Sequence, residues 1–320
     1  MKMVFMPSFC RGVVGTALLG TLLVAAACGG DNSGPNPADR PGQLDVVVAA
    51  YPFQFVVERV AGSNASVQNL TQPGGEPHDV ELTPRQVADV AGADLVVYEQ
   101  SFQPAVDAAV KQAGADHVLD TTTVVPLQPL ADGDGHADAG EEAHDHEGLD
   151  PHVWLDPGNV VSIAAAVTAR LADADPGRRA DFEANLARLT TDLTDLDRDF
   201  ALGLQTCARR EFITSHAAFG YLARQYRLEQ IAISGLSPEA EPSPARMAEV
   251  QNEAREHLIT TIFYETLVSP AVAESIAGDL GLRTDVLDPI EGITNQSRGS
   301  DYVAVMRSNL AALRTANGCQ

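Results

Sequence analysis

The segment "LDVVVAAYPFQFVVERVAG", residues 44–62, decides the class of fold. Its first half is an aliphatic run rich in valine, which is typical of a strand buried on both faces. Its second half, "FQFVVERVAG", spaces apolar residues as a helix does. A buried strand that leads directly into a helix is the repeating unit of parallel sheets, so we expect an α/β fold from this segment outward.

The same alternation of short strands and longer helices continues through both halves of the chain. The strands expected in the first half are "SVQNL", "DLVVYE" and "DHVLD", and those in the second half are "REFITS", "LEQIAIS", "LITTIFYE" and "LRTDVLDP". Helical segments separate the strands in each half. The pattern predicts two βα lobes with parallel-rich sheets, whose ligands lie outside the carboxyl ends of the strands.

A long rigid helix is expected to join the two lobes over residues 176–205. Asp175 is its predicted cap, and Pro176 stands in its first turn. Apolar residues then recur at spacings of three and four. At 1.5 Å per residue such a helix would be about 43 Å long, which is enough to brace two lobes. The lobes themselves are then expected at 44–175 and 206–320.

The start of the chain has the composition of an export signal followed by a tether. Residues 1–27 combine Lys2 and Arg11 with an apolar run of 15 residues that ends in alanines, which predicts a signal peptide. Cys28 follows at once, and "AAAC" resembles the lipobox of bacterial lipoproteins, so we expect a lipidated cysteine and a flexible linker over 28–43. This predicts a protein anchored to the outer face of the cell membrane, or periplasmic. The alternative is an ordinary secreted protein without the lipid.

The chain is strongly acidic, with a formal net charge of −23 over 320 residues. Loss of the signal segment would remove two basic groups and no acidic one, which changes the net charge to −25. An anionic surface of this strength repels nucleic acid and raises the local concentration of cations. Nucleic acid is therefore excluded as a partner.

Two cysteines are left for the exported protein, Cys207 and Cys319, because Cys10 leaves with the signal segment and Cys28 would carry lipid. In an oxidising compartment a single pair predicts a disulfide bond. The bond would close a long loop and contribute roughly 4 kcal/mol in the chain-entropy model. The alternative, a pair of thiolate metal ligands, fits less well because Cys319 stands at a chain terminus.

Residues 131–149, "ADGDGHADAGEEAHDHEGL", interrupt the alternation within the first lobe. They have no aliphatic periodicity, which predicts an exposed loop. Its histidines, His136, His144 and His146, have two interpretations of nearly equal weight. They form weak, exchanging sites that gather metal, or they belong to a solvated insertion with no such role.

Three histidines stand where a strand or loop gives way to a helix: His78, His152 and His216. Asp288 occupies the matching strand end late in the second lobe. In a βα architecture these four positions can converge in the crevice between the lobes. Three imidazoles and one carboxylate suit a tetrahedral divalent ion, which favours Zn²⁺ as the bound metal.

Two further acids stand near these positions. Glu76 and Glu265 could orient the imidazoles from behind, or one of them could replace Asp288 as the fourth ligand. Trp154 is the only tryptophan in the chain, and we expect it to pack beside His152 and to fix its loop.

Four separated motifs give the sequence a specific family resemblance. They are "GGEPHDVELTPRQVADVAGADLVVY", "DPHVWLDPGNV", "TSHAAFGYLARQYRLEQIAISGLSPEAEPSP" and "VLDPI". In this order they resemble the solute-binding lipoproteins of metal-ion ABC importers, the zinc-binding ZnuA/TroA group, over essentially the whole chain from Leu44 onward. The resemblance implies two βα lobes bridged by a rigid helix, with a metal ion held between the lobes.

The resemblance also implies partners. A monomeric receptor of this kind delivers its ion to a membrane permease that is powered by a separate ATPase. Manganese-preferring members commonly have a glutamate where His216 stands, so the histidine favours Zn²⁺ and leaves Mn²⁺ as the alternative. Zinc members often carry a loop rich in histidine and acids before the second ligand, which residues 131–149 match in a short form.

No enzyme motif accompanies the histidines. The chain has no H-E-x-x-H, G-x-S-x-G or G-x-x-x-x-G-K-[ST] pattern. We therefore expect a transport receptor and not an enzyme. Two other classes stay open, namely a secreted zinc-dependent hydrolase with scattered ligands and an adhesin in which the histidines are incidental.

Overall fold

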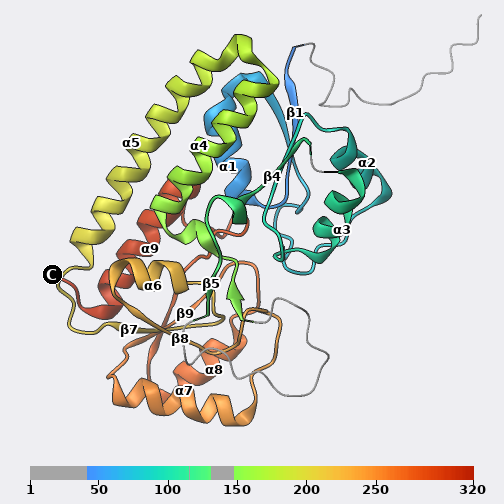
Figure 1. Cartoon of the computed structure of the whole chain (residues 1–320). Coiled ribbons are helices and arrows are strands. Elements are labelled where there is room, and N and C mark those ends of the chain that lie inside the picture. The colour runs from blue at the N-terminus through green and yellow to red at the C-terminus, as the bar shows by residue number, and fades with distance from the viewer. Residues whose placement is uncertain (1–41, 115, 131–147) are drawn as a thin grey trace, which may run out of the picture. The chain divides into compact units, whose positions relative to one another are not determined.

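Two four-stranded sheets form the framework of the protein, and every neighbouring pair of strands in them is parallel (Figure 1). The structure, a computed structural model, describes residues 42–114, 116–130 and 148–320. The first sheet has the order β2 (Ala65–Asn69), β1 (Leu44–Val48), β3 (Leu95–Tyr98) and β4 (Val118–Asp120). The second has the order β10 (Arg283–Val286), β9 (Thr261–Tyr264), β7 (Glu211–Thr214) and β8 (Glu229–Ala232). This confirms the expected α/β fold with two βα lobes.

Helices separate the strands along the chain. In the first lobe they are α1 (Tyr51–Ala61), α2 (Pro84–Gly92), α3 (Pro104–Ala113) and α4 (Pro157–Ala174), with 3-10 turns η1 (Gly62–Asn64), η2 (Thr121–Thr123) and η3 (Val153–Leu155). In the second lobe they are α6 (Gly220–Tyr226), α7 (Pro244–Glu256), α8 (Ala271–Leu280) and α9 (Tyr302–Asn317). A short antiparallel ribbon of β5 (Gln128–Pro129) and β6 (Leu149–Asp150) stands between β4 and α4 in the sequence.

The central strands are buried because helices cover both faces of each sheet. All four residues of β3 are buried, and β1 pairs with it in register from Val46 opposite Leu95 to Val48 opposite Val97. One connected cluster of buried side chains includes both Val48 of the first sheet and Phe212 of the second. The two lobes therefore share a continuous apolar core.

Side chains that precede the helices fix where these begin. Thr83 caps α2 in a reciprocal capping box with Gln86, and Pro84 is the first helical residue. Ser243 caps α7 and Asp301 caps α9 by accepting backbone N–H groups of the first turn. These caps end the loops that lead away from the carboxyl ends of the strands.

The helix between the lobes is α5 (Arg179–Gly203), which has 25 residues and a length of about 37 Å. It begins three residues later than predicted, because Asp175 caps a separate 3-10 turn, η4 (Pro176–Arg178), that precedes it. The helix α5 contacts α1 and α4 of the first lobe and α9 of the second. A long helix that touches both lobes is therefore confirmed.

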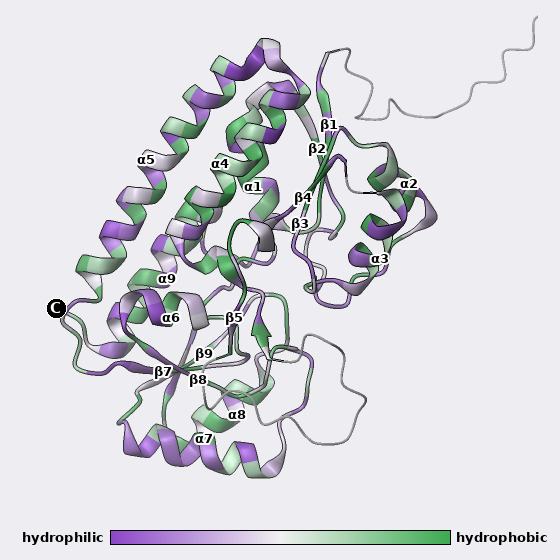
Figure 2. Ribbon diagram, viewed as in Figure 1, coloured by the Kyte–Doolittle hydropathy of each residue, from purple (hydrophilic) through white to green (hydrophobic). Residues whose placement is uncertain are grey.

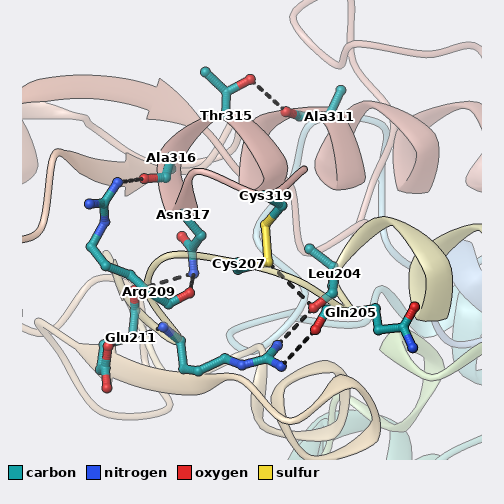
Figure 3. Close-up of a disulfide and its surroundings, with 11 residues drawn as sticks. Leu204, Gln205, Cys207, Arg209, Glu211, Ala311, Thr315, Ala316, Asn317 and Cys319 are labelled. Atoms are coloured by element: carbon teal, nitrogen blue, oxygen red, sulfur yellow. Dashed lines mark hydrogen bonds between the residues drawn. A yellow bond between two sulfur atoms is a disulfide. The ribbon is translucent and has the colours of Figure 1, made fainter.

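A disulfide bond joins Cys207, which follows α5, to Cys319, which follows α9 (Figure 3). The cysteine count predicts this pairing. Nearby, Arg209 donates a hydrogen bond to the carbonyl of Ala316, and Arg210 donates to two carbonyls just beyond α5. The end of α9 is thereby tied to the segment that connects the lobes.

The helices differ in how far they enter the core. Figure 2 shows that α4 is largely hydrophobic and α7 largely hydrophilic. In α7 only Val250 and Ala254 are buried, so this helix covers the surface of its sheet. Within the described ranges, no helix combines the length and the hydrophobicity that a membrane crossing requires.

Some expectations fall outside the described residues. They are the signal peptide over 1–27, the lipidation of Cys28, and the proposed metal-gathering role of His136, His144 and His146. The boundaries of the lobes at 44–175 and 206–320 stay predictions.

Candidate metal centre

Four side chains from distant segments meet at one point: His78, His152, His216 and Glu291. One potential donor atom of each lies within 4.8 Å of the others. His78 lies in the connection from β2 to α2, His152 follows β6, His216 follows β7, and Glu291 follows β10. The sequence pattern singles out the three histidines, but it does not single out the glutamate.

The distances within this group have the scale of a coordination sphere. The Nε2 atoms of His152, His78 and His216 lie 3.0, 3.2 and 3.5 Å from Oε1 of Glu291. The Nε2 atoms of His152 and His216 are 3.5 Å apart. Around a tetrahedral ion with ligand distances of about 2.0–2.1 Å, neighbouring donors are separated by about 3.3 Å. Four of the six donor–donor distances, 3.0–3.5 Å, are thus close to those around a zinc-sized ion.

The turn after β7 presents His216 to the group. The strand ends at Thr214 and α6 begins only at Gly220, so His216 lies in a tight turn between them. The hydroxyl of Thr214 and the amide of Gln230 both donate to the carbonyl of His216, at 2.8 and 2.9 Å. These bonds hold the backbone of His216 in place at the end of the sheet.

Carboxylates stand behind two of the three imidazoles. Nδ1 of His216 lies 2.7 Å from Oε1 of Glu265, and Nδ1 of His152 lies 2.9 Å from Oδ1 of Asp150. Each Nδ1–H can donate to its carboxylate, which leaves the Nε2 lone pair directed at the centre. Among the described residues, Nδ1 of His78 has no such carboxylate; its backbone N–H instead donates to Glu76 at 3.0 Å.

Three of the four side chains in the group are buried. The side chains of His152, His216 and Glu291 are at most 1% exposed, whereas that of His78 is 13% exposed. The second carboxylate oxygens of Glu265 and Glu291 are buried without a hydrogen-bond partner. A buried, unpaired carboxylate oxygen is costly, and a bound cation would stabilise it. Solvent reaches the group from the side of His78.

The pKa values show how strongly the members interact. Burial alone would raise the pKa of Glu291, but hydrogen bonds from His152, His216 and His78 hold it well below its ordinary value. Burial opposes the charged form of His152 and His216, yet their carboxylate neighbours outweigh it and raise both pKa values. Burial next to Glu291 raises the pKa of Glu76 to about 7. The centre therefore attracts cations, protons included.

The structure brings Glu291, and not Asp288, into the fourth position of the group. Asp288 lies in the same loop, but its Oδ1 accepts the backbone N–H of Ile290 and its Oδ2 accepts from Thr266. Ile290 has a φ of 61°, a left-handed conformation that β-branched residues rarely adopt. The Asp288 bond stabilises this turn, and the turn directs the next side chain, Glu291, inward.

The other two acids singled out from the sequence also lie at the group without joining it. Glu265 stands behind His216, where it also accepts from Ser215 at 2.6 Å. Glu76 accepts the backbone N–H of His78. Trp154 packs beside His152 with ring centroids 5.4 Å apart, in agreement with its expected role. The only sequence signal for Glu291 is that it is the second of two acids in the otherwise apolar run "VLDPIEGI".

The comparisons with known proteins agree with a two-lobed fold that carries a candidate metal centre between its lobes. The family model of ZnuA, the periplasmic component A of the zinc-uptake complex, matches residues 46–316. The chain belongs to this family. It is 36% identical over 285 residues to the zinc-binding lipoprotein AdcA of Streptococcus pneumoniae strain R6, covering 87% of this chain and 57% of AdcA.

In two further matches, the aligned region covers nearly all of the matched chain. The high-affinity zinc uptake system protein ZnuA of Bacillus subtilis strain 168 is 33% identical over 304 residues, covering 91% of this chain and 93% of that protein. The crystal structure of the Zn(II)-bound ZnuA-like domain of S. pneumoniae AdcA superposes with a TM-score of 0.71 at 34% identity, covering 86% of this chain and 99% of the domain. The chain thus spans little more than half the length of AdcA and nearly all of its ZnuA-like domain.

Proposed function

We propose that this protein is an extracytoplasmic receptor that holds one Zn²⁺ between its lobes and delivers it to a membrane permease driven by a separate ATPase. The proposed ligands are His78, His152, His216 and Glu291. The observation that carries the proposal is the convergence of three imidazole Nε2 atoms on one buried carboxylate oxygen. The names of the relatives, which describe zinc binding and zinc uptake, support it.

The donor atoms favour zinc over manganese. Imidazole nitrogen and tetrahedral geometry suit Zn²⁺, whereas Mn²⁺ prefers carboxylate, carbonyl and water oxygens in octahedral geometry. Three of the four proposed donors are nitrogens, and those of His152 and His216 are 3.5 Å apart, close to the spacing of a tetrahedral site. Mn²⁺ is the alternative ion for the same site.

The charges around the site also favour a divalent ion. Three neutral imidazoles and the carboxylate of Glu291 leave a bound Zn²⁺ with a charge of about +1. Asp150 and Glu265 lie behind the imidazoles and add negative charge. Arg224, 3.7 Å from Asp150, offsets part of the charge of Asp150. Opposite charges at such short range stabilise an ion that has lost its hydration shell.

The site suits the holding of an ion better than catalysis. A catalytic zinc keeps one coordination position open for water or substrate. Here four protein donors already lie within 4.8 Å of one another, three of them on buried side chains. We therefore propose no enzymatic activity for this protein.

The location of the receptor follows from the start of the chain. Cys28 carries lipid after removal of residues 1–27 and holds the receptor, as a monomer, at the outer face of the cell membrane. The "AAAC" sequence supports this part of the proposal, as does the lipoprotein AdcA among the relatives. Mass spectrometry of the membrane fraction, with and without Cys28→Ala, tests it: the wild-type chain should carry acyl groups and the variant should be released.

A competition titration tests the metal site. Zn²⁺ and Mn²⁺ are each titrated into the mature protein against a chromophoric chelator, for the wild type, for Glu291→Ala, and for Glu81→Ala, which removes an exposed acid of the His78 loop. We expect one zinc per chain, bound at least about a hundredfold more tightly than manganese. Only Glu291→Ala should lose this affinity. Equal affinity for the two ions, or unchanged zinc binding in Glu291→Ala, would contradict the proposal.

A further inference from the structure

Trp154, the only tryptophan of the chain, connects two segments of the centre that are far apart in sequence. It follows His152 by two residues, and its fully buried indole N–H donates to the carbonyl of Pro289 at 2.8 Å. Pro289 precedes Glu291 by two residues. One hydrogen bond between the lobes therefore joins the loop of His152 to the loop of Glu291. Among the described residues, that carbonyl has no other hydrogen-bond donor.

The helix α9 holds both ends of this connection. The hydroxyl of Tyr302, its first residue, donates to the main-chain carbonyl of Trp154 at 2.6 Å. Further along the helix, the side-chain amide of Asn309 makes two hydrogen bonds with the main chain of Asp288, at 3.0 and 2.7 Å. Both loops are thus fixed to one rigid helix as well as to each other.

The indole also supports two imidazoles by packing. Its ring centroid lies 5.4 Å from that of His152 and 5.4 Å from that of Phe102. Phe102 in turn meets the ring of His78 edge-on at 4.9 Å. A displaced indole would therefore move the surfaces against which both imidazoles rest. Side chains of a binding site must be held within about 0.5 Å of the productive geometry, so such a shift reaches the donor atoms.

We propose that Trp154 is a positioning residue for the metal ion: its hydrogen bond to Pro289 fixes the separation of His152 and Glu291. The proposal rests on the proposed function of the same site. Without the indole donor, a buried carbonyl loses its partner, and the Glu291 loop must move to find water or another donor. The distance of 3.0 Å between Nε2 of His152 and Oε1 of Glu291 would then no longer be set by the protein.

Two replacements remove the donor in different ways. Trp154→Phe keeps an aromatic ring but reduces its size. Because the chain has a single tryptophan, growth on the analogue in which sulfur replaces the indole N–H changes only this position and keeps the shape. We expect both proteins to bind one Zn²⁺ with a dissociation constant raised about tenfold to a hundredfold, the range for residues that orient metal ligands. Their Co²⁺ complexes should show visible absorption bands altered from those of the wild type.

A matched control separates positioning from a general loss of stability. Phe182 is a fully buried aromatic residue of α5, with no ring contact to the four site residues among those described. Phe182→Leu should lower the thermal midpoint without changing the zinc dissociation constant or the Co²⁺ spectrum. If Phe182→Leu weakens zinc binding as much as Trp154→Phe does, Trp154 acts through stability alone and the inference is overturned.

Zinc binding by the wild type distinguishes a failure of the proposed function from a failure of the inference about Trp154. If the wild type binds no Zn²⁺, the proposed function fails, and the inference fails with it. If the wild type binds Zn²⁺ and the sulfur-containing protein binds it equally well with the same Co²⁺ spectrum, the inference alone is overturned. A weakened affinity with altered Co²⁺ bands in the sulfur-containing protein supports the inference.

Discussion

The two lobes share one strand topology but present their histidines differently. Counted from the first strand of each lobe, both sheets have the order 2-1-3-4, since the second is β8-β7-β9-β10 from its other edge. His216 follows the last residue of β7 by two positions, and Glu265 stands behind its ring. His78 follows the last residue of β2 by nine positions and is 13% exposed.

This difference shows how connection length determines the rigidity of a ligand. A short turn beside a sheet inherits the position of the strand, so His216 needs little ordering when an ion binds. A long connection must be ordered by its own contacts, and His78 meets the rest of the group through Glu291 and the edge of Phe102. His216 of the second lobe is therefore a preorganised ligand, whereas His78 of the first lobe depends on the other members of the group for its position.

Removal of single histidines tests this contrast and has the largest expected effect. If about 10–16 kcal/mol of zinc binding is shared among four ligands, each contributes about 2.5–4 kcal/mol, or a factor of about a hundred to a thousand in affinity. We expect His216→Ala to exceed this share and His78→Ala to fall below it, because water can replace a partly exposed ligand at lower cost. Isothermal titration with a competing chelator measures both. A greater loss for His78→Ala would reverse the comparison.

Acidification should also weaken zinc binding, by a smaller factor for each pH unit than the loss of a histidine. His152 and His216 have raised pKa values, so protons occupy them at pH values above the ordinary imidazole value near 6.5. Zinc binds only the neutral rings, so affinity is highest above the raised pKa values and falls as pH drops through them. The fall should reach about tenfold per pH unit for each proton displaced. Dissociation constants measured from pH 8 to 5 test this, and a constant value across that range would contradict it.

Replacement of the carboxylate behind His216 should have a moderate effect. Glu265→Gln keeps the shape and an oxygen acceptor for Nδ1–H but removes the charge that makes the imidazole more basic. We expect the zinc dissociation constant to rise about tenfold. The matched variant Asp150→Asn, behind His152, should act in the same direction. Zinc affinity unchanged in both variants would show that these carboxylates do not tune the site.

The smallest effect is expected at Asp288. Asp288→Asn can keep an oxygen that accepts from the N–H of Ile290, so the turn that presents Glu291 should persist. We expect zinc affinity within about threefold of the wild type, as for a retained hydrogen bond. The same titration measures it. A loss as large as that of His216→Ala would make Asp288 a direct ligand.

Much of the framework could be predicted from the sequence because local periodicity encodes it. The valine-rich strands, the apolar spacing of α5 and the cap at Thr83 each leave a signal within one short window. The three histidines could also be singled out, since each stands where a strand or loop gives way to a helix. The disulfide followed from a count of cysteines.

Glu291, the fourth member of the group, and the contacts that position it could not be predicted in this way. The choice between Asp288 and Glu291 depends on the left-handed turn at Ile290, and a β-branched residue gives no signal for that conformation. The bond from Trp154 to Pro289 joins residues that are 135 positions apart, which no local pattern encodes. Such features arise only when the two lobes pack together.

Anomalous diffraction at the zinc edge, from crystals grown with Zn²⁺, tests the central claim most directly. The account predicts one peak between the lobes, about 2.0–2.1 Å from Nε2 of His78, His152 and His216 and from an oxygen of Glu291. A peak held by Asp288 in place of Glu291, or no peak at the point where these histidines meet, would contradict it.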